Sequence, residues 1–281
     1  MAKKPPMNGV KLPTNSAQGN GMQLKSVTKQ FTDPAGRCID VFNNLSIEFE
    51  PNQLHVVMGA SGCGKSTLGY LLAGFTQPDS GEVSLNCVPV QGPGPDRLFV
   101  FQETALWPWM TVTENIIFGP QSRGEASVVE LKSRAAQMLV KFGLADFSDN
   151  YPDQLSGGMK RRAEIAQALI NRPKIMILDE PFRGLDVMTR EILQEYYLAL
   201  FEETRQTTIF ITSELEEALF LADKIYFMGG SPTQIQAVID IKLPRPRNFD
   251  VTLGQEYLAY KQKAMDLLFR DVREQPGKFK G

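Results

Sequence analysis

The chain has 281 residues, of which 42% are hydrophobic and 22% are charged, and its formal net charge is −2. This composition can fill the core of one large domain or two small ones, and it indicates an ordinary globular protein. The three cysteines lack CxxC spacing, so we expect free thiols. The near-neutral charge excludes a positive field over the whole chain that would attract nucleic acid, so we expect no nucleic-acid partner.

The N-terminal part of the sequence predicts a tail and then a hairpin. Residues 1–20 are rich in Pro, Gly, Asn and Ser, so we expect a flexible tail, and they lack the apolar centre of a signal peptide. From Met22 to Phe49, apolar and polar residues alternate around a turn signal at residues 33–36, which predicts antiparallel strands at a sheet edge. No apolar run approaches the roughly 18 to 20 residues that cross a bilayer. If the protein serves a membrane, other chains must cross it.

A glycine-rich loop follows an apolar strand predicted over residues 54–58 and precedes a helix predicted over residues 66–74. Its residues fill the pattern GxxxxGK[ST], which in this strand, loop and helix context is typical of a phosphate-binding loop; a chance glycine-rich turn is the alternative. Lys65 can reach the β and γ phosphates, and Ser66 can be a ligand of Mg²⁺. The expected nucleotide-binding residues here are Gly59, Ala60, Ser61, Gly62, Cys63, Gly64, Lys65, Ser66 and Thr67.

The middle of the chain is predicted to be helical. Residues 103–159 have a mostly helical pattern, clearest over 126–142, which we interpret as an inserted helical subdomain. At its end, Ser156 with Gly157 and Gly158 opens a basic helical stretch, and a hydroxyl with free amides at a helix start can form a second anion site. In isolation the four residues 155–158, LSGG, would be a weak turn signal.

A buried strand predicted over residues 175–178 ends in two carboxylates. Asp179 at the strand tip can hold Mg²⁺ through a water, and Glu180 can accept a proton from the water that attacks the γ-phosphate; a solvated turn is the alternative. A further buried strand is predicted over residues 208–212. Short apolar strands separated by helices favour a mainly parallel sheet covered on both faces. A short strand after residues 229–230 and an amphipathic helix over about 255–269 complete the chain.

The order of these motifs resembles the ABC ATPases. The resemblance implies an α/β P-loop NTPase core of mainly parallel sheet, with an antiparallel β edge and an α-helical subdomain, over residues 21–235, followed by a C-terminal extension over 236–281. It implies ATP and Mg²⁺ as ligands and a head-to-tail dimer, in which Ser156, Gly157 and Gly158 face the γ-phosphate held by the other subunit. Gln102 matches the Q-loop glutamine, which reaches Mg²⁺ and the attacking water. Phe31 stands near the place of the aromatic that stacks on adenine, with packing of the sheet edge as the alternative.

Three further segments, at residues 101–109, 216–223 and 243–247, resemble the nitrate, sulfonate and taurine importer branch of that family. This implies a motor subunit at the cytoplasmic face of the inner membrane that works with transmembrane permease subunits, a second ATPase subunit and a substrate-binding protein. Trp107 and Trp109 follow the Q-loop, where relatives receive a coupling helix; ordinary packing is the alternative. A soluble ABC nucleotide switch, or a scaffold that binds ATP without hydrolysing it, is the competing class of function.

One position departs from the family pattern. The family usually has a histidine after the strand that follows the D-loop (residues 184–186), and this chain has Ser213 there. The only histidine is His55, which we expect to be a packed strand residue. Because a serine hydroxyl is short and neutral, it would reach the γ-phosphate through water. We therefore expect good binding of MgATP and hydrolysis slowed by up to about 10²- to 10⁴-fold, in a homodimer or in a heterodimer completed by a different ATPase subunit.

Overall fold

The computed structural model of the protein describes residues 21–274, and within them ten strands form one sheet in the order β5-β4-β1-β2-β10-β9-β3-β8-β7-β6. The predicted tail over residues 1–20 and the last seven residues of the predicted extension lie outside the described residues. The strands are β1 Met22–Thr32, β2 Cys38–Phe49, β3 Leu54–Gly59, β4 Ser80–Leu85, β5 Val88–Pro89, β6 Arg97–Val100, β7 Ile175–Asp179, β8 Thr207–Thr212, β9 Lys224–Gly230 and β10 Thr233–Asp240.

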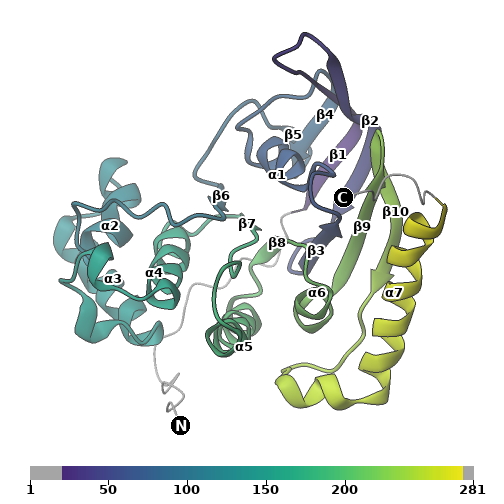
Figure 1. Cartoon of the computed structure of the whole chain (residues 1–281). Helices are drawn as coiled ribbons and strands as arrows, with labels where there is room; N and C mark the ends of the chain where they lie inside the picture. Colours follow the sequence, from purple (N-terminus) through teal and green to yellow (C-terminus); the bar gives the residue numbers. More distant parts are fainter. Residues whose placement is uncertain (1–20, 275–281) are drawn as a thin grey trace.

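The helices lie on both faces of this sheet and at one end of it (Figure 1). They are α1 Lys65–Ala73, α2 Val112–Ser122, α3 Val128–Lys141, α4 Gly157–Leu169, α5 Val187–Thr204, α6 Leu215–Leu221 and α7 Gln255–Glu274, with 3-10 turns η1 Ala145–Phe147, η2 Pro152–Gln154 and η3 Phe249–Leu253. Among the described residues, none of these helices combines the length and the apolar character needed to span a membrane.

The parallel half of the sheet confirms the predicted core. Strands β6, β7, β8 and β3 pair in parallel, and β9 continues this direction beside β3. Every residue of β3, β7 and β8 is buried, because helices cover both faces. Along β3, Val56 packs into one apolar cluster and Val57 into another, as the alternation of side chains requires. The carboxyl ends of the parallel strands therefore meet at one edge, where the phosphate loop and Asp179 lie.

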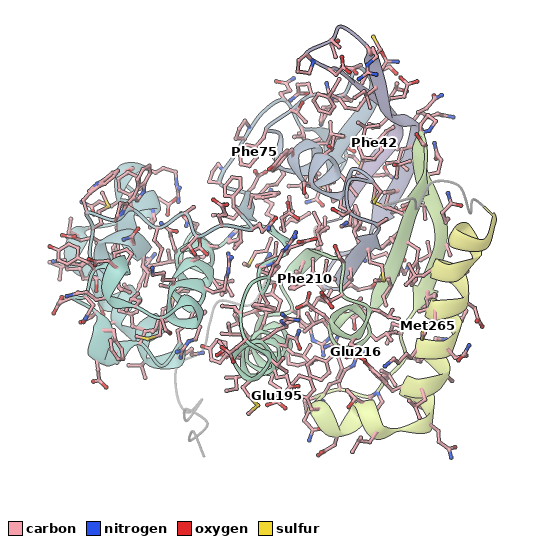
Figure 2. The ribbon with its side chains drawn as sticks, in the orientation of Figure 1. Phe42, Phe75, Glu195, Phe210, Glu216 and Met265 are labelled. Carbon is pink, nitrogen blue, oxygen red and sulfur yellow. The ribbon has the colours of Figure 1, made fainter. Side chains whose placement is uncertain are left out.

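The antiparallel half forms the predicted β edge. Strand β1 pairs antiparallel with β2 and β4, and the interior of this half is apolar; Phe42 is fully buried there, and Phe210 is fully buried in the parallel half (Figure 2). Strand β2 also supports the phosphate loop: a Cβ at Gly64 would lie 2.7 Å from Cγ1 of Val41, and Gly64 has a φ of +93°. Only glycine meets both requirements without strain.

Helices are found within the segment predicted to be helical, and the bounds 103–159 of the insertion stay a prediction, since α4 begins at Gly157 and continues to Leu169. Helices α2 and α3, together with α4, gather beyond β6 at one end of the sheet (Figure 1). Thr111 caps α2 through a reciprocal capping box with Glu114, and Ser127 caps α3. The predicted helix over 126–142 thus begins at Val128 and ends at Lys141, because its first residues supply the cap.

The C-terminal segment is more closely joined to the core than the sequence suggests. Strand β10 crosses the predicted boundary between residues 235 and 236, pairing antiparallel with β9 and touching β2 at Thr233. The buried guanidinium of Arg247 donates to the carbonyls of Phe220 and Ala222. Arg245 forms ion pairs with acidic residues of the core. The division at residue 235 stays a prediction, and the strand that crosses it argues for one continuous unit.

The single histidine is buried in β3, as predicted. The ring of His55 is fully buried; its Nε2 lies 2.7 Å from the carbonyl oxygen of Glu50, and its Nδ1 has no hydrogen-bond partner among residues 21–274. Burial lowers the pKa of His55 to about 4, from an ordinary value of 6.5, because the charged ring would be poorly solvated. Between these two values the unfolded chain binds a proton that the folded chain does not.

The free energy of unfolding is therefore expected to fall by up to about 3 kcal/mol from the contribution of His55 as the pH drops from 6.5 to 4. The measurement is urea unfolding at several pH values for wild type and for His55→Phe, since phenylalanine suits the neighbouring rings of Phe49 and Tyr226. The difference in the free energy of unfolding between the two proteins separates the contribution of His55 from the contributions of the carboxylates. Parallel pH dependence in both proteins would contradict this prediction.

Candidate nucleotide site

The glycine-rich loop forms a cradle at the end of β3. Gly62 and Gly64 have φ values of +78° and +93°, which bend the backbone tightly before α1 begins at Lys65. The Lys65 ammonium is buried and donates to the carbonyls of Gly59 and Ala60 at 2.9 and 3.0 Å. A buried cation and the free amides of a helix start at one place make a site for an anion such as phosphate.

A hydroxyl and a carboxylate meet beside this cradle. The Ser66 hydroxyl hydrogen-bonds to the carboxyl group of Asp179, the last residue of β7. Burial raises the pKa of Asp179, although the hydrogen bond from Ser66 opposes the shift. Oxygen ligands of these two kinds fit Mg²⁺, which prefers hard oxygen donors and usually shares its coordination with phosphates and waters. A bound cation would also offset the cost of burying the Asp179 charge.

Glu180 follows Asp179 and turns its carboxylate to a different pair of partners. Its backbone adopts a φ of +42°, in the left-handed region that side chains rarely occupy. The Ser213 hydroxyl donates to Oε1 and the Arg183 guanidinium donates to Oε2, both at 2.7 Å. Burial raises the pKa of Glu180, but these two hydrogen bonds outweigh it and the net pKa is lowered. The carboxylate is therefore ionised and oriented at neutral pH.

The start of the loop and Glu180 line one cavity of about 760 Å³, whereas residues 62–67 and Asp179 are not among the residues that line it. Gly59, Ala60 and Ser61 of the loop form part of its wall, and Glu180 and Ser213 form another part. The predicted loop, base and serine thus converge, because β3, β7 and β8 end at the same edge of the sheet. Helix α7 of the extension supplies a further wall through Lys261, Met265 and Leu268, which the sequence did not predict.

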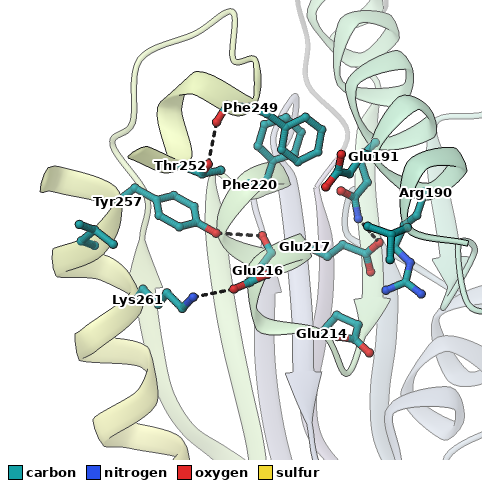
Figure 3. Close-up of a pocket in the computed structure, with 13 residues that line it drawn as sticks. Arg190, Glu191, Glu214, Glu216, Glu217, Phe220, Phe249, Thr252, Tyr257 and Lys261 are labelled. Carbon is teal, nitrogen blue, oxygen red and sulfur yellow. Dashed lines mark hydrogen bonds and ion pairs between the residues drawn. The ribbon is translucent and has the colours of Figure 1, made fainter. Parts of the chain in front are cut away.

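A second cavity, of about 340 Å³, shows how α7 is held there (Figure 3). Lys261 of α7 forms an ion pair with Glu216 of α6, and the rings of Phe220 and Phe249 are stacked with centroids 4.4 Å apart. Figure 2 shows Glu216 and Met265 on the neighbouring elements α6 and α7. Because α6 begins two residues after Ser213, these contacts fix α7 relative to the nucleotide cavity.

The LSGG residues lie elsewhere in the chain. Ser156 caps α4 and accepts a hydrogen bond from the amide of Met159 at 3.3 Å. Side chains at the next two positions would crowd the neighbouring segment: a Cβ at Gly158 would lie 2.7 Å from Thr189 of α5. These residues do not line the 760 Å³ cavity. Helix α4 packs beside β6, whereas the cradle follows β3, with β8 and β7 between these two strands, so one chain holds the cradle and the LSGG turn apart.

Two other predicted site residues stand apart from the cavity wall. Gln102 is exposed, and its carbonyl oxygen accepts a hydrogen bond from Arg161 at 2.6 Å. Phe31 on β1 is 45% exposed, and the Lys29 ammonium lies 5.3 Å from its ring centroid. Neither residue lines the cavity, so their roles toward the nucleotide stay predictions. Arg183, in contrast, was not predicted; its place three residues after Glu180, at i,i+3 spacing, was the signal available.

The two tryptophans form an exposed aromatic cluster beside α2. The rings of Trp107 and Trp109 have centroids 5.2 Å apart, and Phe118 lies edge-on to Trp107 at 5.9 Å. Trp109 is 65% exposed. Asn115 holds the segment in place by accepting a hydrogen bond from the Trp107 amide at 2.7 Å. Packing inside the chain leaves much of this aromatic surface open, which is typical of a protein interface.

The chain is similar to known proteins over most of its length. Residues 42–183 match the family model described as ABC transporter. The chain is 40% identical over 264 residues to the nitrate import ATP-binding protein NrtD of Synechococcus elongatus, covering 92% of this chain and 96% of that protein. It is 37% identical over 251 residues to the bicarbonate transport ATP-binding protein CmpD of Synechocystis sp., covering 88% and 89%. A dimeric, post-hydrolysis structure of the ATP-binding cassette MJ0796, bound to ADP and Pi, is 28% identical with a TM-score of 0.70, covering 79% and 99%.

Proposed function

This chain belongs to the ABC transporter family and is an ABC-type ATPase, and from that premise we propose that it is the motor subunit of an importer of small anions. The names of its relatives support the kind of cargo, since NrtD is named for nitrate import and CmpD for bicarbonate transport. The observation that carries the proposal is the convergence of the phosphate loop, Glu180 and Ser213 on one cavity. The subunit works peripherally at the cytoplasmic face of the inner membrane.

Each residue of the site has a task in hydrolysis. The loop amides and Lys65 bind the β and γ phosphates of ATP, and Ser66 and Asp179 would hold Mg²⁺, which would neutralise phosphate charge. Glu180 accepts the proton of the attacking water as the bond to the γ-phosphorus forms and the bond to ADP breaks. Gln102 orients this water, and Phe31 stacks on adenine. The ionised, doubly hydrogen-bonded state of Glu180 supports its assignment as the base.

A second ATPase subunit completes the site. Ser156, Gly157 and Gly158 lie on a different surface from the loop of their own chain, so we assign them to the γ-phosphate bound by the partner subunit. The dimeric state of the MJ0796 cassette supports such pairing. The partner is an identical chain or a different ATPase, and a substrate-binding protein delivers the cargo to the permease.

Hydrolysis in this subunit is slow in our proposal. Ser213 donates to Glu180, so its hydroxyl serves the base and not the phosphate. A neutral serine also offers no second proton or charge to the reacting phosphate. A scaffold that binds ATP without hydrolysing it is the second candidate function, and Ser213 at the switch position favours it. Single-turnover hydrolysis separates the two candidates, because a scaffold leaves bound ATP intact.

The partners are tested by purification from membranes. An affinity-tagged chain, expressed in its native cell and extracted with detergent, is expected to bring integral membrane chains with it. Mass spectrometry then identifies the permease and shows whether a second ATPase with a histidine at the switch position is present. A chain that purifies without any membrane protein, while still binding ATP, would favour the soluble switch.

The aromatic cluster is expected to dock the permease. Replacing both Trp107 and Trp109 with alanine should remove most of the recovered permease, because exposed aromatic anchors dominate interface energies at about 2 kcal/mol or more each. Nucleotide affinity should stay at the wild-type value. The control is Val128→Ala together with Val129→Ala, which removes exposed apolar surface from α3. Equal permease recovery in the tryptophan variant and the control would place the docking surface elsewhere.

A further inference from the structure

The carboxylate of Glu180 is held at both of its oxygens. Ser213 reaches Oε1 from the end of β8, and Arg183 reaches Oε2 from the turn that follows β7. The backbone turn keeps the second partner close: the Arg183 amide donates to the Glu180 carbonyl at 3.1 Å, and the Arg183 guanidinium reaches the Glu180 carboxylate at 2.7 Å. Glu180, Arg183 and Ser213 all line the 760 Å³ cavity.

A single hydroxyl would leave this carboxylate free to rotate. The terminal torsion of a glutamate is broad, so one donor on Oε1 does not fix the direction of Oε2. The planar guanidinium of Arg183 restrains the second oxygen and places a permanent positive charge beside it. A carboxylate oxygen has two lone-pair sites, so each held oxygen can still accept a proton from water.

The ion pair itself contributes little to folding. The Arg183 side chain is 62% exposed, and exposed ion pairs are strongly screened by solvent. The chemical setting of this pair is different from that of other exposed pairs, because its partner is the carboxylate of Glu180, which lines the 760 Å³ cavity and has a backbone φ of +42°. Arg183 can therefore act on the orientation of the Glu180 carboxylate.

We propose that Arg183 is a positioning residue for ATP hydrolysis: with Ser213 it clamps the Glu180 carboxylate toward the attacking water, and so compensates in part for the serine at the switch position. This inference rests on the proposed ATPase function. One neutral and one cationic side chain together restrain one catalytic base. The Arg183 guanidinium bonds to the base, so we expect its removal to change turnover and to leave nucleotide binding intact.

The test compares Arg183→Ala, Arg183→Gln and Arg183→Lys in the full-length chain assembled with its permease. Arg183→Ala is expected to lower kcat for MgATP about tenfold, with the KM for ATP and the thermal unfolding midpoint unchanged. Arg183→Lys should recover much of the lost kcat, and Arg183→Gln less, because lysine keeps the charge. Arg134→Ala removes a half-buried arginine paired with Glu130 on α3 and should leave kcat unchanged.

The same comparison in a Ser213→His background tests the shared role. If Ser213 and Arg183 act together on Glu180, Arg183→Ala should lower kcat by a clearly smaller factor in the Ser213→His background than in wild type. The effects of the two substitutions on kcat will then not multiply. Wild-type kcat in Arg183→Ala, independent losses in the double variant, or a raised KM with unchanged kcat would each overturn the proposal. A wild-type chain without activity above a Lys65→Ala control would instead refute hydrolysis itself, and the proposal with it.

Discussion

Lys65→Ala is expected to weaken the affinity for ATP by more than about 100-fold, which corresponds to about 3 kcal/mol. The Lys65 ammonium is buried at the cradle and already held by the carbonyls of Gly59 and Ala60. Its removal takes away the charge that faces the phosphates and leaves both carbonyls without this donor. Isothermal titration of the purified chain with MgATP measures the loss directly.

The control for this experiment is Lys132→Ala, which removes an exposed ammonium from α3. It should bind ATP like wild type. Thermal unfolding shows whether Lys65→Ala is folded, since burial of the lysine could also matter for the loop itself. If Lys65→Ala folds and binds ATP with wild-type affinity, residues 59–67 do not hold the triphosphate, and the site proposed here is wrong.

Ser213→His is expected to raise the rate of single-turnover hydrolysis, by up to about 10²- to 10⁴-fold if the imidazole does acid–base work. The side chain at position 213 is exposed and borders a cavity of about 760 Å³, so the larger ring has room. Rapid-quench measurement with labelled ATP under enzyme excess gives the rate without product release. ATP affinity should change little, because Ser213 contacts Glu180 in the nucleotide-free chain.

Ser213→Ala provides the matched control. It removes the hydroxyl that donates to Glu180 Oε1 and adds no imidazole, so its rate should fall below wild type. Equal rates for wild type and Ser213→His would show that serine at this position is harmless to catalysis. If a different ATPase supplies the working site, the gain in Ser213→His will appear in the assembled complex as a second active site.

Much of the site could be predicted because its signals are local. The phosphate loop needs glycines, a lysine and a hydroxyl within nine consecutive residues between a strand and a helix, and all of these are adjacent in sequence. Asp179 and Glu180 likewise stand directly after a buried strand. The parallel sheet then brings the strand ends together, as the alternation of buried strands and helices indicates.

The remaining features depend on contacts between distant segments. Ser213 meets Glu180 across 33 residues, and α7 reaches the cavity from the opposite end of the chain. Periodicity predicts that α7 is amphipathic but not which surface it covers. The roles of Gln102 and Phe31 depend on a nucleotide and a second subunit, which lie outside this chain, so its fold alone does not bring them to the cavity.

Strand β10 has a practical consequence for enzymology. A shortened protein that stops at residue 235 would sever β10 after its third residue and discard α7, and with it one side of the 760 Å³ cavity. The severed end would uncover backbone groups of β9, which invite aggregation. Kinetic work on a cassette trimmed at residue 235 would then describe an altered cavity, because Lys261, Met265 and Leu268 of α7 would be missing from its wall.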